Sequence, residues 1–299
     1  MLSLPSVKEV GLRNEADYYG ASYCIAKQLG YWSVPKIECK GWTHGWTPVD
    51  ESINRPEYFI YHGLGSDYFS DDVFFVQNQF VEQLLRRRGF NNSFAIGMPI
   101  IYAGDSQVPI KRRSGSLLLM PSANCSNDLD RSELIQKIKD SRGRFAEVYV
   151  SVHWSSYLAD KKKLESLGYN VICGPKISDK NGLERARRVF QYFDYVVSDG
   201  FGSHLVYANY FGCKVCIPFS YKTCSIDDCV RELEKTNYPK DLYEVFYQRS
   251  SKNYLEKKAG FLFQDIFKSI SNKEWADNEL GVPFKKSPVE LARLFGWKR

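Results

Sequence analysis

The chain has 299 residues, of which 43% are hydrophobic, and a formal net charge of +6. This composition is typical of a globular protein with room for two domains of ordinary size, and it excludes a disordered or fibrous chain. The charge is too weak and too dispersed to predict a nucleic-acid partner. No window approaches the roughly eighteen uninterrupted apolar residues of a membrane-spanning helix, and the charged first residues do not resemble a signal peptide, so we expect a cytoplasmic protein.

The first part of the chain, residues 1–110, alternates helices and strands, although less regularly than the rest. Its apolar periodicity predicts helices at 15–29 and 77–88, and strands at 36–41, 57–62, 73–77 and 93–97. The segment 103–115 has the glycine, proline and charge content of a linker. We therefore predict a first domain at 1–110 and a second at 111–299.

The second part is more regular from residue 116 onward. The pattern predicts strands at 116–120, 147–152, 170–173, 195–198 and 214–217, separated by helices at 131–141, 156–167, 181–192 and 203–212. Short apolar strands that alternate with helices are typical of a parallel sheet covered on both faces. We expect a Rossmann-like domain whose ligands bind beyond the carboxyl ends of the strands.

The chain is predicted to be helical after residue 225. Its final segment contains Ser287, Pro288 and Glu290, and serine with glutamate at this spacing indicates a helix start. We expect this last helix to pack back on the first domain. The same segment combines basic and aromatic side chains as interfacial helices do, so peripheral contact with the inner face of a membrane is the alternative.

The eight cysteines are interpreted as reduced thiols, because a cytosolic chain of this size rarely forms disulfides. Cys213, Cys216, Cys224 and Cys229 come closest to a zinc pattern, but no second Cys-x-x-Cys pair follows. We interpret them as core residues and predict no metal site.

His44 lies in the segment GWTHGWTPVD, directly after a predicted strand. Tryptophan faces stack on sugar rings and nucleobases, so Trp42 and Trp46 are candidate acceptor contacts. His44 is a candidate general base, because an imidazole titrates close to neutral pH, and Asp50 and Glu51 are rival bases. The alternative is that both tryptophans cover the core and His44 caps a nearby group.

Four further residues are candidates for the acceptor side. His62 ends a predicted strand of the first domain, and Asp67 follows it. Ser122 and Asn124 follow the first strand of the second domain. The alternative for the last two is a polar loop before a helix.

The stretch YVVSDGFGSHLVYANYFGCKVCIP, residues 195–218, reads as strand, loop, helix and strand. Its glycines allow a ligand to approach the backbone, Ser203 is a candidate helix cap, and the start of the helix suits an anion such as phosphate. The predicted donor-binding residues of this stretch are Ser198, Asp199, Gly200, Gly202 and Ser203.

Four other residues fall at the predicted ligand edge of the second domain. His153 ends the strand EVYVSV, and His204 follows the loop just described. For each histidine a structural role is the alternative. Gly174 and Lys176 follow the next strand, and Lys176 would offer a positive charge to phosphate, unless it is a solvated turn residue.

These motifs resemble the GT-B glycosyltransferases of bacterial cell-surface polysaccharide clusters. The segment VSVHWSS is similar to the strand-end His-Pro of sialyl- and Kdo-type transferases, and the segment at 198–218 is similar to their phosphate loop. The segment FVEQLLRRRGFNNSFAIGMPII is similar to the helix and Gly-x-Pro turn of their first domain. Trp154 stands in place of the proline, and the E-x7-E pair of retaining enzymes is absent, since Tyr207 stands eight residues after Asp199.

The resemblance implies an α/β fold of the GT-B type, with two Rossmann-like domains facing each other across a cleft. It implies that Gly202 and Ser203 hold the donor phosphate, that His153 contacts the nucleotide, and that His44 or an acid near it deprotonates the acceptor.

The expected function is metal-independent transfer of a sugar from a nucleotide-activated donor to a glycan or lipid-linked acceptor, with no cofactor besides the donor. A sugar-nucleotide epimerase and a non-catalytic nucleotide-sugar-binding protein are the alternatives.

Overall fold

The computed structural model of the chain describes residues 2–46, 48, 69–103, 110–121, 132–218, 221 and 243–297. The chain divides into two compact units. The first comprises Met1–Pro109, Pro175–Val189 and Glu274–Arg299, and the second comprises Ile110–Gly174 and Phe190–Lys273. The fold is α/β with parallel sheets, as expected from the sequence.

The second unit contains a five-stranded sheet in its described part. The strands are β4 (Arg113–Leu119), β5 (Glu147–Val152), β6 (Asn170–Cys173), β7 (Phe193–Val197) and β8 (Lys214–Cys216). They pair in parallel in the order β6-β5-β4-β7-β8. The predicted strands of this half of the chain are therefore confirmed, because each lies within two or three residues of its expected bounds.

The strand order decides where the second unit can bind a ligand. From β4 the chain first builds outward through β5 and β6, and it then returns to add β7 and β8 on the other side of β4. Leu119 of β4 lies opposite Val150 and also opposite Val197. The order thus reverses between β4 and β7, and in sheets of this kind ligands bind outside the carboxyl ends of the strands at such a switch point.

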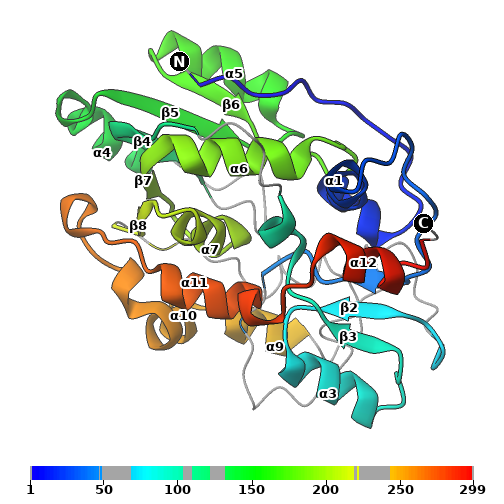
Figure 1. Ribbon diagram of the computed structural model, residues 1–299. Helices are drawn as coiled ribbons and strands as arrows, with labels where there is room; N and C mark the ends of the chain where they lie inside the picture. The colour runs from blue at the N-terminus through cyan, green and yellow to red at the C-terminus, as the bar shows by residue number, and fades with distance from the viewer. Residues whose placement is uncertain are drawn as a thin grey trace. The chain divides into compact units, whose positions relative to one another are not determined.

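Helices cover this sheet. Within the second unit they are α4 (Ser132–Asp140), α5 (Tyr157–Ser166), α7 (Ser203–Tyr210), α9 (Tyr243–Ser250) and α10 (Lys252–Ala259), with the short 3-10 turns η3 (Arg142–Arg144), η5 (Gly260–Leu262) and η6 (Ile266–Lys268). Ile138 of α4 and Leu164 of α5 pack with Leu117 and Val150 in the core. Figure 1 shows the strands side by side, with α5 beside β6 and α7 beside β8.

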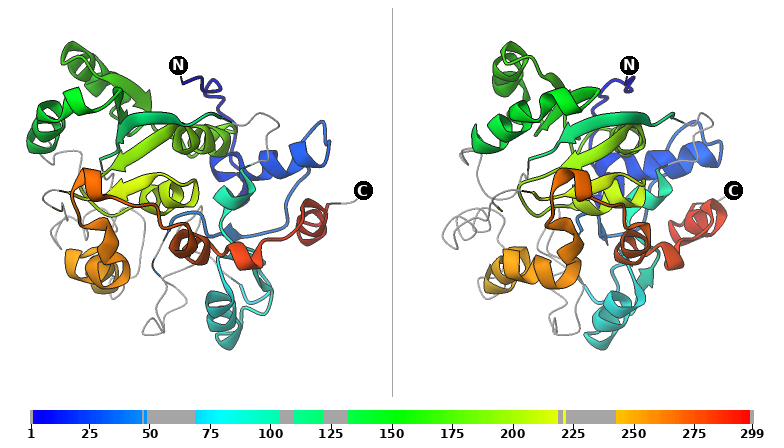
Figure 2. Two further views of the ribbon diagram at one scale, coloured as in Figure 1. Left: turned by 60° about the vertical axis from the view of Figure 1, so that its left-hand side comes forward. Right: turned by 90° about the vertical axis from the view of Figure 1, so that its left-hand side faces the viewer.

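The first unit contains a three-stranded parallel sheet in its described part, in the order β1-β2-β3. Its strands are β1 (Gly41–Trp42), β2 (Phe74–Val76) and β3 (Ser93–Ala95), and its helices and 3-10 turns include η1 (Glu15–Gly20), α1 (Ala21–Gln28), α3 (Gln79–Arg87), η2 (Pro99–Tyr102), η7 (Val282–Phe284) and α12 (Pro288–Leu294). In Figures 1 and 2, α3 lies beside β2 and β3. Helices α6 (Gly182–Tyr192) and α11 (Lys273–Leu280) each contain a boundary between the two units.

Two predicted elements of the first unit need correction. The strand expected at 36–41 is reduced to Gly41–Trp42, because β1 pairs with β2 at these two residues alone in the described part of the chain. The residues before Gly41 line a cavity. The helix expected at 15–29 is divided into a 3-10 turn and α1. The interruption occurs because Tyr19 and Gly20, at the junction, adopt positive φ angles of 54° and 81°. The strand expected at 57–62 lies outside the described residues.

The C-terminal helix α12 belongs to the first unit. Ser287 and Glu290 form the expected capping box at its start. Phe295 and Trp297 are buried, and the Phe295 ring lies 5.7 Å from the Trp42 ring. The aromatic side chains that suggested membrane contact are therefore core residues here, and that contact stays a prediction. Among the described helices, none is long and apolar enough to cross a membrane.

Candidate functional site

The loop after β7 lies at the switch point of the second unit and is held by internal hydrogen bonds. Ser198 directly follows the strand and is completely buried. Its Oγ atom lies 2.7 Å from Nε2 of His204 and 3.2 Å from the carbonyl oxygen of Gly200. A Cβ atom at Gly202 would lie 2.6 Å from Nδ1 of His204, so the glycine makes room for the imidazole ring. These internal contacts fix the shape of the loop.

His204 is neutral at physiological pH. Burial lowers the pKa of its imidazole to about 4. A neutral ring offers one donor and one acceptor nitrogen, and in either tautomer the hydroxyl of Ser198 can complement Nε2. His204 therefore holds the loop in shape and carries no charge toward a ligand.

The helix that follows the loop begins differently from the prediction. Gly202, and not Ser203, occupies the N-cap position of α7, and Ser203 is its first helical residue. A glycine has no side chain to accept hydrogen bonds from the first N–H groups of a helix, which carry the positive end of the helix dipole. This arrangement suits an incoming anion.

His153, Trp154 and Gly174 lie at the same carboxyl edge of the sheet. Val152, the last residue of β5, pairs with Cys173, the last residue of β6, so the loops after both strands leave the sheet together. His153 is exposed, with Nδ1 2.7 Å from the hydroxyl oxygen of Ser155.

Trp154 and Gly174 lie beside His153 at this edge. The ring of Trp154, 40% exposed, lies 5.6 Å from that of His153. A Cβ atom at Gly174 would lie 2.8 Å from the carbonyl oxygen of Val152, so only glycine fits there.

Tyr221 is a residue of this region that the sequence did not indicate. Its hydroxyl donates to the carbonyl oxygen of Ser250 at 2.6 Å, and it also bonds to the backbone of Phe201. Burial, together with the nearby carboxylate of Asp199, raises the pKa of the phenol. Tyr221 thereby ties the loop to the end of α9. No local pattern predicts this contact, because its partners lie 20 or more residues away.

Lys176 belongs to the first unit, whereas Gly174 belongs to the second. The Nζ atom of Lys176 lies 2.6 Å from Oε2 of Glu9, so an acidic partner already neutralises its charge. Its contact with a donor phosphate stays a prediction.

In the first unit, the two tryptophans near His44 are buried. Trp42 is 0% exposed and donates from Nε1 to the carbonyl oxygen of Gly97 at 2.8 Å. Trp46 is 3% exposed and donates to Glu279 at 2.7 Å. Both indole rings are core residues in this structure, so neither presents a free face for stacking.

His44 and Glu15 meet at the backbone of Trp42. The Trp42 N–H donates to Oε2 of Glu15 at 3.1 Å, and the Trp42 carbonyl oxygen lies 3.2 Å from Nδ1 of His44. Since a carbonyl oxygen only accepts, this contact places a ring proton on Nδ1. A Cβ atom at Gly41 would lie 2.8 Å from Oε2 of Glu15, so the glycine is needed for this approach.

Glu15 is the candidate residue of the first unit that sequence reasoning missed. It is only 6% exposed, and burial raises the pKa of its carboxyl group to about 7, although the hydrogen bond from Trp42 opposes this shift. In the sequence Glu15 looks like an ordinary acidic residue in the first turn of a helix. Its burial depends on β1, which is distant in the chain.

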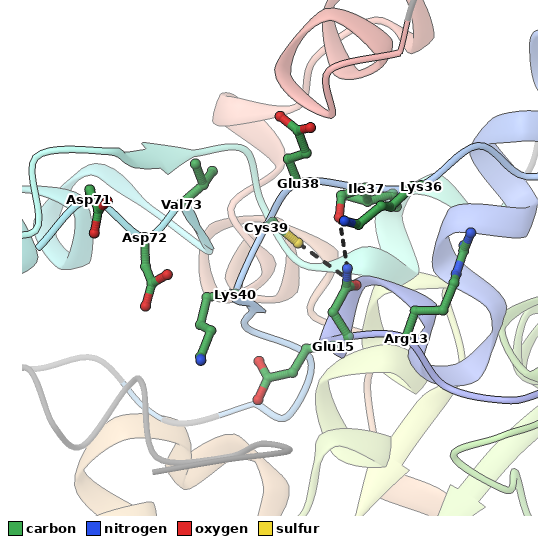
Figure 3. Close-up of a pocket in the computed structure, with 11 residues that line it drawn as sticks. Arg13, Glu15, Lys36, Ile37, Glu38, Cys39, Lys40, Asp71, Asp72 and Val73 are labelled. Atoms are coloured by element: carbon green, nitrogen blue, oxygen red, sulfur yellow. Dashed lines mark hydrogen bonds between the residues drawn. The ribbon is translucent and has the colours of Figure 1, made fainter. Parts of the chain in front are cut away.

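A cavity of about 560 Å³ opens beside Glu15. Figure 3 shows its lining, which comes from three segments of the first unit. The lining residues are Arg13, Asn14, Glu15, Lys36, Ile37, Glu38, Cys39, Lys40, Asp71, Asp72 and Val73. Arg13 is already paired with Asp17, at 2.7 Å, so its charge is largely neutralised.

The remaining predicted site residues, Asp50, His62, Asp67, Ser122 and Asn124, lie outside the described residues. Within the described ranges, no group of three or more His, Cys, Asp and Glu side chains is arranged to hold a metal ion. The cysteines that the structure describes, Cys24, Cys39, Cys173, Cys213 and Cys216, are free thiols. Comparisons of the sequence with protein-family models and with curated proteins found no match.

Proposed function

We propose that the protein is a glycosyltransferase of the GT-B type. It would transfer a sugar from a nucleotide-activated donor to a hydroxyl group of a glycan or lipid-linked acceptor. The observation that carries this proposal is the loop from Ser198 to Ser203. It lies at the switch point of a doubly wound parallel sheet, it is ordered by its own hydrogen bonds, and it leads into a helix whose N-cap is a glycine.

The donor would bind at the carboxyl edge of the second unit. Its phosphate groups would lie at the loop and at the start of α7, where the helix dipole favours negative charge. The exposed imidazole of His153 would contact the nucleotide, and Gly174 would let the loop after β6 pass close to the end of β5. As the sugar leaves, negative charge develops on the phosphate, and groups fixed in advance stabilise that charge most effectively.

The first unit would supply the base. His44 is one candidate, because an imidazole titrates close to neutral pH and its Nδ1 atom is held 3.2 Å from the Trp42 carbonyl oxygen. Asp50 is another and lies outside the described residues. The acceptor hydroxyl loses its proton as its oxygen forms a bond to the anomeric carbon, and the bond from that carbon to the phosphate oxygen breaks.

Calorimetric titration with a panel of UDP-, GDP- and CMP-sugars tests the donor site. The variant Ser203→Asp places a negative charge at the start of α7, where it would repel the donor phosphate. We expect at least about a 100-fold loss of affinity for whichever donor the wild type binds, equivalent to about 2.7 kcal/mol. Ser166→Asp, a change of the same kind on the exposed end of α5, is the control and should bind normally.

The products distinguish this function from the alternatives. Incubation with each bound sugar nucleotide and a set of oligosaccharide acceptors should give a glycoside and a free nucleotide. Interconversion of the sugar nucleotide would indicate an epimerase, and binding without turnover would indicate a non-catalytic binding protein. Unchanged affinity in the Ser203→Asp variant would place the donor elsewhere.

A further inference from the structure

Glu15 is a nearly buried carboxyl group beside a cavity, and the donor site gives it no role. Only 6% of the residue is exposed. One carboxyl oxygen, Oε2, accepts the N–H of Trp42 at 3.1 Å. The other, Oε1, has no hydrogen-bond donor among the described residues, and Glu15 lines the cavity. A carboxyl oxygen left available in this way can accept a hydrogen bond from a ligand.

The cavity has the charge pattern of a site for a hydroxyl-rich ligand. The carboxyl groups of Asp71 and Asp72 and the ammonium groups of Lys36 and Lys40 line it together with Glu15. In Figure 3 the charged ends of Glu15, Lys40 and Asp72 are turned toward the same space. A sugar hydroxyl can donate a hydrogen bond to a carboxylate and accept one from an ammonium group, so both kinds of lining side chain can bind it. Because the lining carries both positive and negative side chains, it does not favour an anionic ligand over a neutral one.

We propose that this cavity binds the acceptor through the hydroxyl groups of a sugar, and that Oε1 of Glu15 takes the proton from the hydroxyl that attacks. This assignment rests on the proposed glycosyltransferase function and names its acceptor class and its base. The acceptor O–H bond breaks and its proton moves to Oε1. The hydroxyl oxygen forms a bond to the anomeric carbon of the donor, and the bond from that carbon to phosphate breaks, with its electron pair leaving on the nucleotide. Glu15 then releases the proton to water.

The buried position of Glu15 also gives its carboxyl group a proton affinity that suits a general base. Burial raises the pKa of the carboxyl group to about 7, which makes it a stronger base than an exposed glutamate while still partly ionised at neutral pH. The titratable and charged groups around it are Tyr18 on the same 3-10 turn, Cys39 and Lys40 before β1, Asp72 before β2, and His44 after β1. Since the base must be ionised, transfer should increase with pH through about 7.

The variant Glu15→Gln tests the assignment. Glutamine has the same shape and can still accept the N–H of Trp42, but it cannot take a proton. We expect kcat/KM for transfer to fall by about 100-fold or more. The increase in kcat/KM through pH 7 should disappear, while the affinity for the sugar nucleotide, measured by calorimetry, should stay within twofold of the wild type. Glu274→Gln, the same change at an exposed position of α11, is the control and should show wild-type rates and the wild-type pH profile.

The outcomes separate this assignment from the proposed function. If the wild type transfers sugar and Glu15→Gln transfers it equally well, the proton acceptor is another group and the assignment fails, while the glycosyltransferase function stands. If the wild type transfers no sugar from any donor of the panel, both fail. Should circular dichroism show that Glu15→Gln does not fold, Glu15→Asp, whose carboxyl group is shorter by one methylene, should transfer at least about tenfold more slowly. A wild-type kcat/KM that is flat between pH 6 and 8 overturns the assignment in either case.

Discussion

The candidate sites of the two units are built in different ways. The loop of the second unit comes from one continuous stretch, Ser198 to His204, and a hydrogen bond between its first and last residues holds it. The cavity of the first unit comes from three segments separated by 20 or more residues, and its central carboxyl group depends on the backbone of β1. The first arrangement is built mainly from neighbouring residues, with Tyr221 as a distant support, whereas the second exists only when distant segments are packed together.

The largest expected loss of stability tests the dependence of the first unit on distant segments, and it concerns Gly20. A Cβ atom there would lie 2.0 Å from the carbonyl oxygen of Lys180, and the φ angle is +81°. Gly20→Ala should lower the free energy of unfolding by about 4 kcal/mol, through backbone strain and displacement of the 175–189 segment. Urea titration measures this loss.

Gly30→Ala is the matched control. Its φ angle of +75° is similar, but nothing lies within 4 Å of the added Cβ atom. It should cost only about 1 kcal/mol. Equal losses in the two variants would show that long-range packing at Gly20 is unimportant.

The two sites should respond to pH in opposite directions. Burial raises the pKa of Glu15 from 4.5 to about 7, so the folded state holds this proton more tightly than the unfolded state. The corresponding stability is complete below pH 4.5 and is lost as the pH rises through 7, by about 3 kcal/mol. Glu15→Gln should remove this loss. Urea titrations of both proteins from pH 4.5 to 8 measure the difference, and parallel curves would contradict the buried carboxyl group.

His204 should show the reverse behaviour. Burial lowers the pKa of its imidazole from 6.5 to about 4, so protonation favours the unfolded state. The corresponding stability is complete above pH 6.5 and is lost as the pH falls through 4, by about 3 kcal/mol. His204→Gln should lack this acid loss. NMR titration of the His204 ring offers a direct check, and an ordinary pKa near 6.5 would contradict the prediction.

A smaller effect is expected at Ser198. Ser198→Ala removes the hydroxyl that bonds to His204 and leaves a partly buried ring nitrogen without this partner. We expect a loss of about 2 kcal/mol in unfolding free energy and a weaker donor affinity, because the loop is no longer held before binding. Ser166→Ala on the exposed end of α5 is the control. An unchanged donor affinity would indicate that the bond serves stability alone.

The smallest effect is expected at the start of α12. Ser287→Ala removes one half of the capping box and should cost about 1 kcal/mol. Because α12 carries Phe295 against Trp42, the loss should appear in the stability of the first unit and should leave donor affinity unchanged. A change in donor affinity would contradict the assignment of the donor site to the second unit.

Sequence reasoning recovered the elements whose signals are local. The strand at 147–152 and the strand at 170–173 lie within the expected bounds, and the Ser287 and Glu290 cap is present. Reasoning failed where a conformation depends on close packing. The residues before Gly41 look like a strand but border a cavity, and the helix expected through Gly20 is interrupted by backbone that only the Lys180 segment explains.

The sequence by itself therefore predicts much of the secondary structure of the second unit. Each of its signals depends on a few neighbouring residues: the alternation of apolar strands with helices, the glycine-containing loop and the helix start. Packing alone decides that Glu15 is buried and holds its proton to about pH 7, that Trp42 and Trp46 are core residues, and that Tyr221 reaches the loop at Phe201. The physical reason is that desolvation is set by every segment around a group. A carboxyl group has the same chemistry in any sequence, and its proton affinity changes only when distant parts of the chain exclude water from it.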